Sequence, residues 1–363
     1  LFRQTLIVKD CAQLVKVCFV ISCKIPTNAI KFRLQCSNPQ WKTARIMAKH
    51  LLFFFLDGIG LGAGDPGSNP FCDHDMPALT KLLDGHRLLA SDFSPQPRYS
   101  DRASWLALDA CLGVPGLPQS ATGQATLLTG LNIPSLVGGH DGPKPSPAVA
   151  SYLRNGSLFT KLQNTGHTTA LLNAYPPRYF EAIKSGYRLP GAIAMAALHA
   201  GMTLNTTLEL KSGNALSADF TGQGWQDHLR IPGVPVITAR TAGDRMAQLA
   251  SGYAFGIFEF WLSDVLGHRQ QMPPARELLA TLDEVITGLI EIWNDQDGLI
   301  LITSDHGNLE DLSTRRHTAN PVPLVLIGSI QHRLHFLDGM GKANPGSIYD
   351  LTRVAPAIIQ FLG

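Results

Sequence analysis

The chain has 363 residues, of which 45% are hydrophobic and 16% charged, and its formal net charge is +2. These values describe an ordinary globular protein that is large enough to bury a sizeable core. Residues 1–46 hold eight of the 30 basic residues and one of the 28 acidic ones, so the rest of the chain carries a net negative charge and does not predict a nucleic-acid-binding surface.

The first 46 residues form a leader of doubtful status, which we place outside the fold. Its one short apolar run, residues 17–22, is far below the ~20 apolar residues of a membrane span, and no small-x-small cleavage site follows it. A targeting segment is one interpretation. Because the sequence from Met47 onward reads like a natural start, we favour the interpretation that residues 1–46 are upstream sequence.

Cysteines are rare beyond the leader, where only Cys72 and Cys111 remain. Without a C-x-x-C pair or a close cluster, they predict neither a disulfide framework nor a thiolate zinc site. We therefore expect a reducing, cytoplasmic location and no membrane partner.

Short apolar runs alternate with helix-like stretches along the remaining sequence. The predicted strands are residues 51–56, 169–174, 254–262, 299–303 and 323–327. The predicted helices are residues 77–83, 192–200, 275–293 and 351–361. This alternation predicts an α/β fold with a mostly parallel sheet that is covered on both faces.

The composition changes between residues 176 and 241, where Gly, Pro, Asn and Ser become frequent. Such a segment is either a surface elaboration or a cap over a site, and we favour a small inserted cap. The predicted core domain then consists of residues 47–175 and 242–363.

A glycine-rich turn follows the first predicted strand at Asp57. Gly58, Gly60 and Ala63 formally match a dinucleotide fingerprint, but that fingerprint requires a helix to open at the glycines, whereas residues 65–70 continue as a loop. We therefore expect the glycines to turn the backbone beside an ion that Asp57 binds. A simple turn residue at the end of a strand remains the ordinary alternative.

Ser120 precedes a helix-compatible run that Gly130 closes. The ordinary interpretation is an N-cap serine. The functional interpretation uses the same geometry, because a helix amino terminus offers N–H groups and partial positive charge to a phosphoryl group and favours ionisation of a hydroxyl. Ser120 is therefore a candidate nucleophile.

Three histidines lie near the ends of predicted strands. Asp264 and His268 have the four-residue spacing that places both side chains on one side of a helical turn. Asp305 and His306 follow the strand at residues 299–303, and His317 precedes the next strand. A lone histidine is usually a buried structural residue, but three in such positions favour a metal site.

Five segments together resemble the alkaline phosphatase superfamily, and within it the cofactor-independent phosphoglycerate mutase and phosphopentomutase branch. They are residues 56–60, 120–123, 264–268, 303–308 and 317–323. The order of the segments also matches, and residues 350–356 resemble the closing segment of the family. The resemblance implies a three-layer, alkaline-phosphatase-like α/β sandwich with a mostly parallel central sheet and a small inserted cap.

The resemblance further implies two divalent metal ions. The ligands of one ion would be Asp57, Ser120, Asp305 and His306. The ligands of the other would be Asp264, His268 and His317. Carboxylates mixed with imidazoles suit Mn²⁺ or Zn²⁺, and the sequence does not choose between these two metals.

The implied reaction is transfer or hydrolysis of a phosphate ester through a phosphoserine at Ser120, on a small phosphorylated substrate. The family's mutases usually have a His where Gln124 stands, and they carry a larger inserted domain rich in arginines. A mutase must keep water away from its phosphoserine, so the shorter insertion favours a phosphatase or phosphodiesterase. The alternative is a mutase that acts on a phosphosugar or phosphoglycerate.

Two further alternatives are less favoured: a nucleotide-binding oxidoreductase, and a non-catalytic, metal-stabilised binding module. Sulfatase chemistry is disfavoured because Ser120 is not followed by the Pro and Arg that those relatives need. Basic side chains that could grip phosphate are Arg102, Arg154, Arg178, Lys184, Arg188 and Arg269, although exposed cations are mostly solvated surface.

Overall fold

Strand β1 (His50–Leu56) lies inside the sheet because both of its faces are apolar. Leu51, Phe53 and Phe55 enter one hydrophobic cluster, and the alternate residues of the strand enter the cluster on the opposite face. This is the two-sided burial that the apolar run predicts. The computed structural model describes residues 49–342 and 348–363, so the expected leader, residues 1–46, lies outside the described residues.

The sheet has eight strands, with the order β2-β3-β7-β6-β1-β5-β4 and with β8 paired to β3. Strands β4, β5, β1 and β6 pair in parallel, whereas β7 is antiparallel to both β6 and β3. The strands besides β1 are β2 (Arg98–Tyr99), β3 (Ala103–Asp109), β4 (Thr169–Leu171), β5 (Phe255–Phe260), β6 (Gly298–Thr303), β7 (Val322–Gly328) and β8 (Tyr349–Asp350).

All five strands predicted from apolar runs are present, as β1, β4, β5, β6 and β7. The four predicted helices are present as α2 (Pro77–Leu82), α8 (Ala192–His199), α13 (Met272–Ile292) and α15 (Val354–Leu362), the last preceded by a 3-10 turn. The mostly parallel α/β fold is therefore confirmed. Strand β3 was not predicted, although six of its seven residues are buried.

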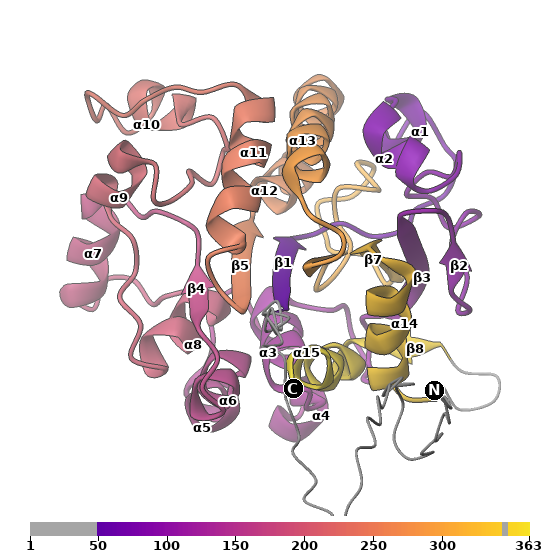
Figure 1. The fold of residues 1–363 in the computed structure, drawn as a ribbon, viewed down its shortest axis with the longest axis horizontal. Helices are drawn as coiled ribbons and strands as arrows, with labels where there is room; N and C mark the ends of the chain where they lie inside the picture. Colours follow the sequence, from indigo (N-terminus) through magenta and orange to yellow (C-terminus); the bar gives the residue numbers. More distant parts are fainter. Residues whose placement is uncertain (1–48, 343–347) are drawn as a thin grey trace, which may run out of the picture. The chain divides into compact units, whose positions relative to one another are not determined.

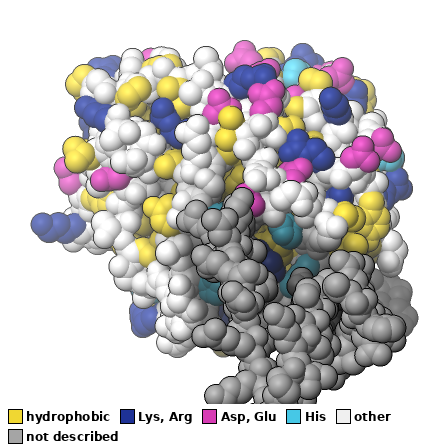
Figure 2. All heavy atoms as spheres, viewed as in Figure 1, with side chains coloured by type: hydrophobic (Ala, Val, Ile, Leu, Met, Phe, Trp, Pro, Cys, Tyr) yellow, Lys and Arg dark blue, Asp and Glu magenta, His cyan; other side chains and the backbone are white. Residues whose placement is uncertain are grey.

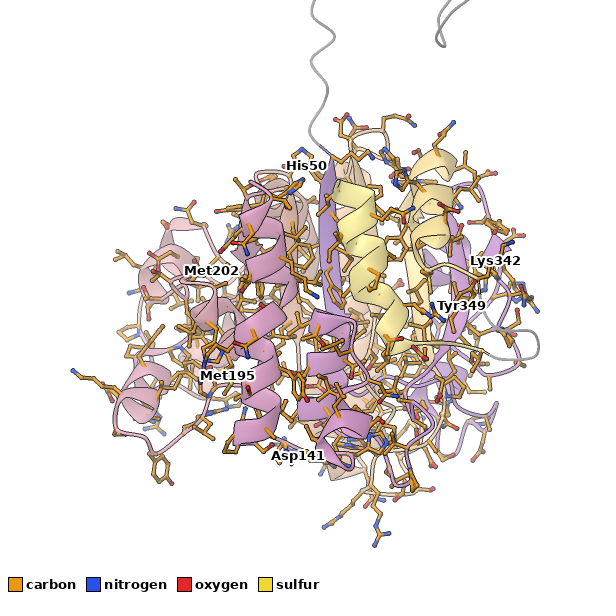
Figure 3. The ribbon with its side chains drawn as sticks, turned by 90° about the horizontal axis from the view of Figure 1, so that it is seen from below. His50, Asp141, Met195, Met202, Lys342 and Tyr349 are labelled. Atoms are coloured by element: carbon orange, nitrogen blue, oxygen red, sulfur yellow. The ribbon has the colours of Figure 1, made fainter. Side chains whose placement is uncertain are left out.

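Helices cover both faces of the sheet (Figure 1). One hydrophobic cluster includes residues of α3 (Ser120–Thr129), α5 (Pro147–Gly156), α6 (Leu158–Asn164), α8, α14 (Ile330–Gly339) and α15. The other includes residues of α1 (Pro70–Asp73), α2, α11 (Ala239–Ala250) and α13. Figure 3 looks onto the first of these faces, where the yellow helix α15 lies over the indigo strand β1.

The segment expected to form a cap, residues 176–241, contains α7 (Pro177–Lys184), α8, α9 (Thr207–Ser212) and α10 (Gln223–Asp227). Helix α8 packs into the main core. A separate small cluster contains Leu210, Trp225 and Val234. The division of the chain into a core domain and a cap stays a prediction.

The surface shown in Figure 2 has acidic and basic side chains interspersed. Within residues 49–342 and 348–363, no helix combines the length and apolar character needed to cross a bilayer. The remaining helices are α4 (Ile133–Val137) and α12 (Leu262–Arg269).

Candidate metal centre

The topology of the sheet brings four loops together at one edge. Strands β6, β1 and β5 are parallel neighbours, so the segments that follow their carboxyl ends meet there. Strand β7 runs in the opposite direction, and its amino end therefore lies at the same edge. Asp57 follows β1, and Asp264 and His268 lie in helix α12 after β5. Asp305 and His306 follow β6, and His317 precedes β7.

The first group of predicted ligands surrounds His306, whose side chain is fully buried. Its Nε2 lies 2.9 Å from Ser120 Oγ, 3.4 Å from Asp57 Oδ1 and 3.5 Å from Asp305 Oδ2. Ser120 is the first residue of α3 and the N-cap is Gln119, so the ordinary N-cap interpretation of Ser120 is wrong. The Ser120 hydroxyl instead contacts the His306 imidazole, which lies beside the two carboxylates.

The second group contains Asp264, His268 and His317. Nε2 of His268 lies 3.3 Å from Asp264 Oδ2, and Nε2 of His317 lies 3.4 Å from Asp264 Oδ1. The two Nε2 atoms are 3.3 Å apart. The groups adjoin each other, because the rings of His306 and His317 stack with centroids 3.7 Å apart. In each group, three protein ligand atoms lie within 4.8 Å of one another.

Backbone carbonyls orient the three imidazoles. Nδ1 of His317 lies 2.8 Å from Pro118 O, and Nδ1 of His268 lies 2.7 Å from Arg315 O. Nδ1 of His306 faces Gly307 O at 3.4 Å. A carbonyl can only accept, so we assign the ring proton to Nδ1 in each case, which leaves the Nε2 lone pair directed at the carboxylates. Metal-bound histidines are typically held in this way.

Burial and crowding shift the carboxylate pKa values. The pKa of Asp57 lies well above its usual value, because the group is buried and faces Asp305 and Asp264. Burial and the charge of Asp264 raise the pKa of Asp305 to about 7. Burial alone would raise the pKa of Asp264, but contacts with His317, His306 and Asn308 lower it to about 2.

The pKa values of His306 and His317 are shifted in opposite directions. Burial and the charge of His317 lower the pKa of His306 to about 3. Burial alone would lower the pKa of His317 as well, but its contact with Asp264 raises it. In the absence of a cation, a proton between His317 and Asp264 therefore takes up part of the negative charge.

Two observations test whether metal ions fit these groups. Asp57 Oδ1 is buried and has no hydrogen-bond partner within the described residues. The Nε2 atoms of His268 and His317 lie 3.3 Å apart, and with both ring protons on Nδ1 their facing lone pairs would repel unless a proton or a metal cation lay between them. A cation in each group would satisfy these atoms, and the mixture of carboxylates and imidazoles suits divalent metals.

Polar side chains next to the ligands fix the positions of the loops. Gln124 of α3 donates to Asp57 Oδ2 and to Asp305 Oδ2, at 3.2 Å in both cases.

Gly58 has a φ of 70°, and a Cβ at this position would lie 2.9 Å from Asp264 Cβ. The glycine turn thus lets the loop after β1 approach Asp264, as expected, and α1 begins only at Pro70, so no helix opens at the glycines.

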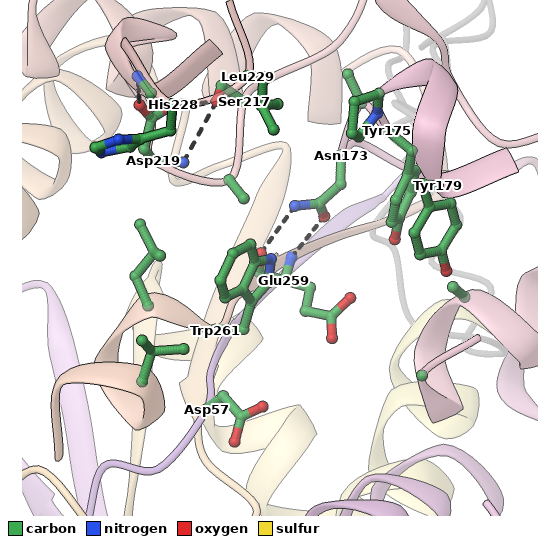
Figure 4. Close-up of a pocket in the computed structure, with 18 of the residues that line it drawn as sticks. Asp57, Asn173, Tyr175, Tyr179, Ser217, Asp219, His228, Leu229, Glu259 and Trp261 are labelled. Atoms are coloured by element: carbon green, nitrogen blue, oxygen red, sulfur yellow. Dashed lines mark hydrogen bonds between the residues drawn. The ribbon is translucent and has the colours of Figure 1, made fainter. Parts of the chain in front are cut away.

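A cavity of about 740 Å³ opens beside the two groups (Figure 4). Asp57, Ser120 and Asp264 line the cavity, and Figure 4 shows Asp57 at the opposite side from His228 and Asp219. The lining also includes Lys144, Arg188, Glu259 and the stacked rings of Tyr175 and Tyr179. The size is within the range of about 300–1,000 Å³ that is typical of ligand pockets.

Some residues of the site were expected from the sequence and others were not. Of the basic side chains considered for phosphate binding, Arg178 and Arg188 line the cavity, whereas Arg102 pairs with Asp295 at 2.7 Å. Lys144 and Glu259 were not expected. Glu259 lies within the apolar run of β5, where pattern alone indicates a structural role.

Comparison with known proteins supports the resemblance that the motifs indicate. Residues 216–363 match the model of the Metalloenzyme superfamily. The 2,3-bisphosphoglycerate-independent phosphoglycerate mutase of Desulforudis audaxviator is 30% identical over 136 residues, which are 36% of this chain and 25% of that protein. The mutase of Parasynechococcus marenigrum is 32% identical over 119 residues, or 30% of this chain and 21% of that protein. The chain thus spans about a quarter of the length of these relatives.

Solved structures also align with the chain at low sequence identity. An alkaline phosphatase from the Antarctic bacterium TAB5 aligns with a TM-score of 0.47 and 14% identity, over 87% of this chain and 98% of that one. A phosphoglycerate mutase from Leishmania mexicana aligns with a TM-score of 0.46 and 12% identity, over 88% and 96%. The match of residues 216–363 to the model of the Metalloenzyme superfamily agrees with the resemblance seen in the motifs.

Proposed function

We propose that the protein is a two-metal-dependent phosphatase or phosphodiesterase that forms a phosphoserine at Ser120. The observation that carries the proposal is the position of the Ser120 hydroxyl, 2.9 Å from the imidazole of His306 and beside two groups of acidic and imidazole ligands. A hydroxyl placed next to such ligand sets, and at a helix amino terminus, is suited to attack phosphorus.

Asp57, Asp305 and His306 would hold one ion together with Ser120, and Asp264, His268 and His317 would hold the other. Bound Mn²⁺ or Zn²⁺ would lower the pKa of the serine hydroxyl and of a water molecule, and would neutralise charge on the phosphoryl oxygens. Gln124 would keep the carboxylates of Asp57 and Asp305 in place.

In the first step, Ser120 Oγ forms a bond to phosphorus while the bond from phosphorus to the ester oxygen breaks, and the departing alcohol leaves with the proton that the serine hydroxyl lost. In the second step, a water oxygen bonds to phosphorus and the bond to Ser120 Oγ breaks. The serine regains its proton, and inorganic phosphate is released from a monoester substrate or a phosphate monoester from a diester substrate. The first residues of α3 orient the phosphoryl group, because the amino end of the helix favours negative charge.

A phosphoglycerate or phosphosugar mutase is the second candidate, and the names of the similar curated proteins favour it. The chemistry at Ser120 would be the same, except that a substrate hydroxyl would replace water in the second step. Isotope-labelled 3-phosphoglycerate that is converted to the 2-isomer without release of free phosphate would support the mutase.

The test measures turnover of nitrophenyl phosphate by the metal-free protein, with and without added Mn²⁺ or Zn²⁺. Ser120→Ala should lower the metal-stimulated rate by about a thousandfold or more. Brief reaction followed by acid quenching should leave one phosphoryl group on the peptide that contains Ser120. Ser329→Ala, which removes the N-cap of the distant helix α14, is the matched control and should keep its activity.

Retention of most turnover by Ser120→Ala would contradict the phosphoserine mechanism. A folded, metal-replete protein without turnover on a broad panel of phosphate esters would instead favour the metal-stabilised binding module.

A further inference from the structure

Glu259 and Lys144 present their charged groups to the same part of the cavity. A Cβ at Gly191 would lie 3.6 Å from Lys144 Nζ and 3.9 Å from Glu259 Oε1, so both groups border one point on the cavity wall. They form no ion pair with each other, and neither forms one with any other described residue. Two opposite charges thus lie near each other with space between them.

The backbone holds Glu259 firmly while its carboxylate is left available. The side chain of Asn173 accepts from the Glu259 N–H and donates to the Glu259 carbonyl, at 2.8 Å in both cases (Figure 4). Figure 4 shows the carboxylate pointing away from this clamp, into the space between Asp57 and the two tyrosines. The buried hydroxyl of Tyr175 has no hydrogen-bond partner within the described part of the chain.

Burial affects both charged groups. It raises the pKa of Glu259 to about 7, against the opposing effect of Lys144. Burial, together with the charge of Arg188, lowers the pKa of Lys144. Partly desolvated polar groups without protein partners are costly unless a ligand satisfies them.

The chemistry of the gap selects one kind of ligand group. An ammonium would be attracted by Glu259 but repelled by Lys144 and Arg188, and a carboxylate would be attracted by these cations but repelled by Glu259. A hydroxyl both accepts and donates, so it can accept from Lys144 Nζ and donate to Glu259. The volume of the cavity leaves room for an organic group of substantial size beyond the phosphoryl group.

We propose that Glu259 and Lys144 determine specificity by binding a hydroxyl on the organic group of the phosphate ester. The inference rests on the proposed function, because it assigns the organic part of the substrate to the same cavity. Esters that lack such a hydroxyl would leave Lys144 without a partner and Glu259 with only the neighbouring Tyr175 hydroxyl, and would bind more weakly.

The test uses phosphonates, which cannot be hydrolysed, so that binding is read without turnover. Calorimetry with the Mn²⁺-loaded protein compares 2,3-dihydroxypropylphosphonate with propylphosphonate. The dihydroxy compound should bind about tenfold more tightly or better, the effect expected of a hydrogen bond to a charged group. Glu259→Leu should abolish this preference, and Glu259→Gln, which can still accept a hydrogen bond, should retain part of it.

Glu181→Leu is the matched control, because Glu181 is exposed on α7 and does not line the cavity; it should keep the preference. Equal affinities of the wild-type protein for the two phosphonates would overturn the inference and leave the proposed function intact. If neither phosphonate bound, the proposed function itself would fail. Lys144→Met should also remove the preference for the dihydroxy compound. If this variant instead bound both compounds equally more weakly and kept the preference, Lys144 would contact the phosphoryl group, and the proposal that Lys144 and Glu259 bind a hydroxyl together would be contradicted.

Discussion

Asn308 connects the two ligand groups through Asp264. Its Nδ2 donates to Asp264 Oδ1 at 2.7 Å and to the Asp264 carbonyl at 3.2 Å. Asn308 follows the segment that contains Asp305 and His306, so this contact ties the loop after β6 to helix α12. Gly267 makes the contact possible, since a Cβ there would lie 2.6 Å from the Asn308 amide.

We predict that Asn308→Ala weakens metal binding at the site of Asp264, because the carboxylate loses the donor that orients it. The affinity for one of two Mn²⁺ or Zn²⁺ ions should fall by about 10–100-fold, as is typical when the partner of a ligand is removed. Calorimetric titration of the metal-free protein measures this effect. Asn205→Ala removes an amide that donates to backbone carbonyls near β4, and it should leave both affinities unchanged. Equal affinities of Asn308→Ala and wild type would show that the contact does not position Asp264.

Glu310 holds three of the loops together from inside the protein. Its buried carboxylate accepts from Gly60 N at 2.9 Å, Asn308 N at 2.7 Å, Asn320 Nδ2 at 3.0 Å and the Thr318 hydroxyl. These donors lie in the loops that carry Asp57, Asp305 and His317. Glu310 is 1% exposed, so each contact is protected from water.

Glu310→Gln should therefore weaken metal binding as well as stability. The amide replaces one acceptor oxygen with a donor, which must then face donors from a neighbouring loop. We expect both metal affinities to fall by about 10–100-fold, together with a loss of stability of about 1–3 kcal/mol. Asp283→Asn is a matched control, because Asp283 is also a buried carboxylate that accepts two backbone N–H groups, at the start of α2.

The control should lose stability but keep its metal affinities. Calorimetry measures the affinities and urea denaturation measures the free energy of unfolding. If Glu310→Gln lost stability and kept both metal affinities, Glu310 would support only the fold.

The positions of the candidate ligands other than Ser120 could be predicted from the sequence because each lies in a segment that follows or precedes a buried strand, whereas their binding of metal stays a prediction. Strands such as β1, with six consecutive buried residues, are evident from their composition alone. Strand β3 was missed because Ala and Ser dilute its apolar pattern. Its buried Ser104 is satisfied by Arg333 of α14, at 2.9 Å, a partner that no local pattern reveals.

The residues of the cavity were harder to predict, since their roles depend on contacts between distant segments. Glu259 belongs to a strand that reads as core, and only the fold brings Lys144 and Tyr175 to it. Glu310 lies next to a recognisable motif, yet the sequence does not show which loops donate to its carboxylate. Position relative to a strand end is thus predictable, whereas the partners across loops are not.

The metal-free protein should lose stability as the pH rises from about 5 to about 8. The pKa values of Asp57, Asp305 and Glu259 are higher in the folded protein than in the unfolded chain. The stability that these groups contribute is therefore fully present below their pKa values in the unfolded chain. It is lost as the pH rises through their pKa values in the folded protein, about 7 for Asp305 and Glu259. The raised pKa of His317 acts in the same direction. His306 opposes them, because its lowered pKa destabilises the protein as the pH falls below its unfolded value.

Thermal unfolding in the presence of a chelator measures this dependence. Asp305→Asn should reduce the slope, since it removes one of the carboxylates that bind protons in the folded state. Saturating Mn²⁺ or Zn²⁺ should reverse the trend and stabilise the protein more at the higher pH, because metal binding requires deprotonated ligands. An unfolding temperature that rose with pH in the metal-free protein would contradict the assigned pKa shifts.

Helices α11 and α13 cross at two glycines, and we predict that neither glycine tolerates a methyl group. A Cβ at Gly243 would lie 2.0 Å from Val285 O, and one at Gly288 would lie 2.1 Å from Arg240 O. In an exposed helix, Gly→Ala stabilises by about 1 kcal/mol, but here the backbones would have to separate, which costs about 1–3 kcal/mol or more. Urea denaturation of Gly243→Ala should therefore show a net loss. Gly156→Ala in α5 is the control, because the nearest atom to a Cβ at this position would be 3.6 Å away, and it should be neutral or stabilising. An equal change in the free energy of unfolding of the two variants would mean that the helices cross less closely than these distances indicate.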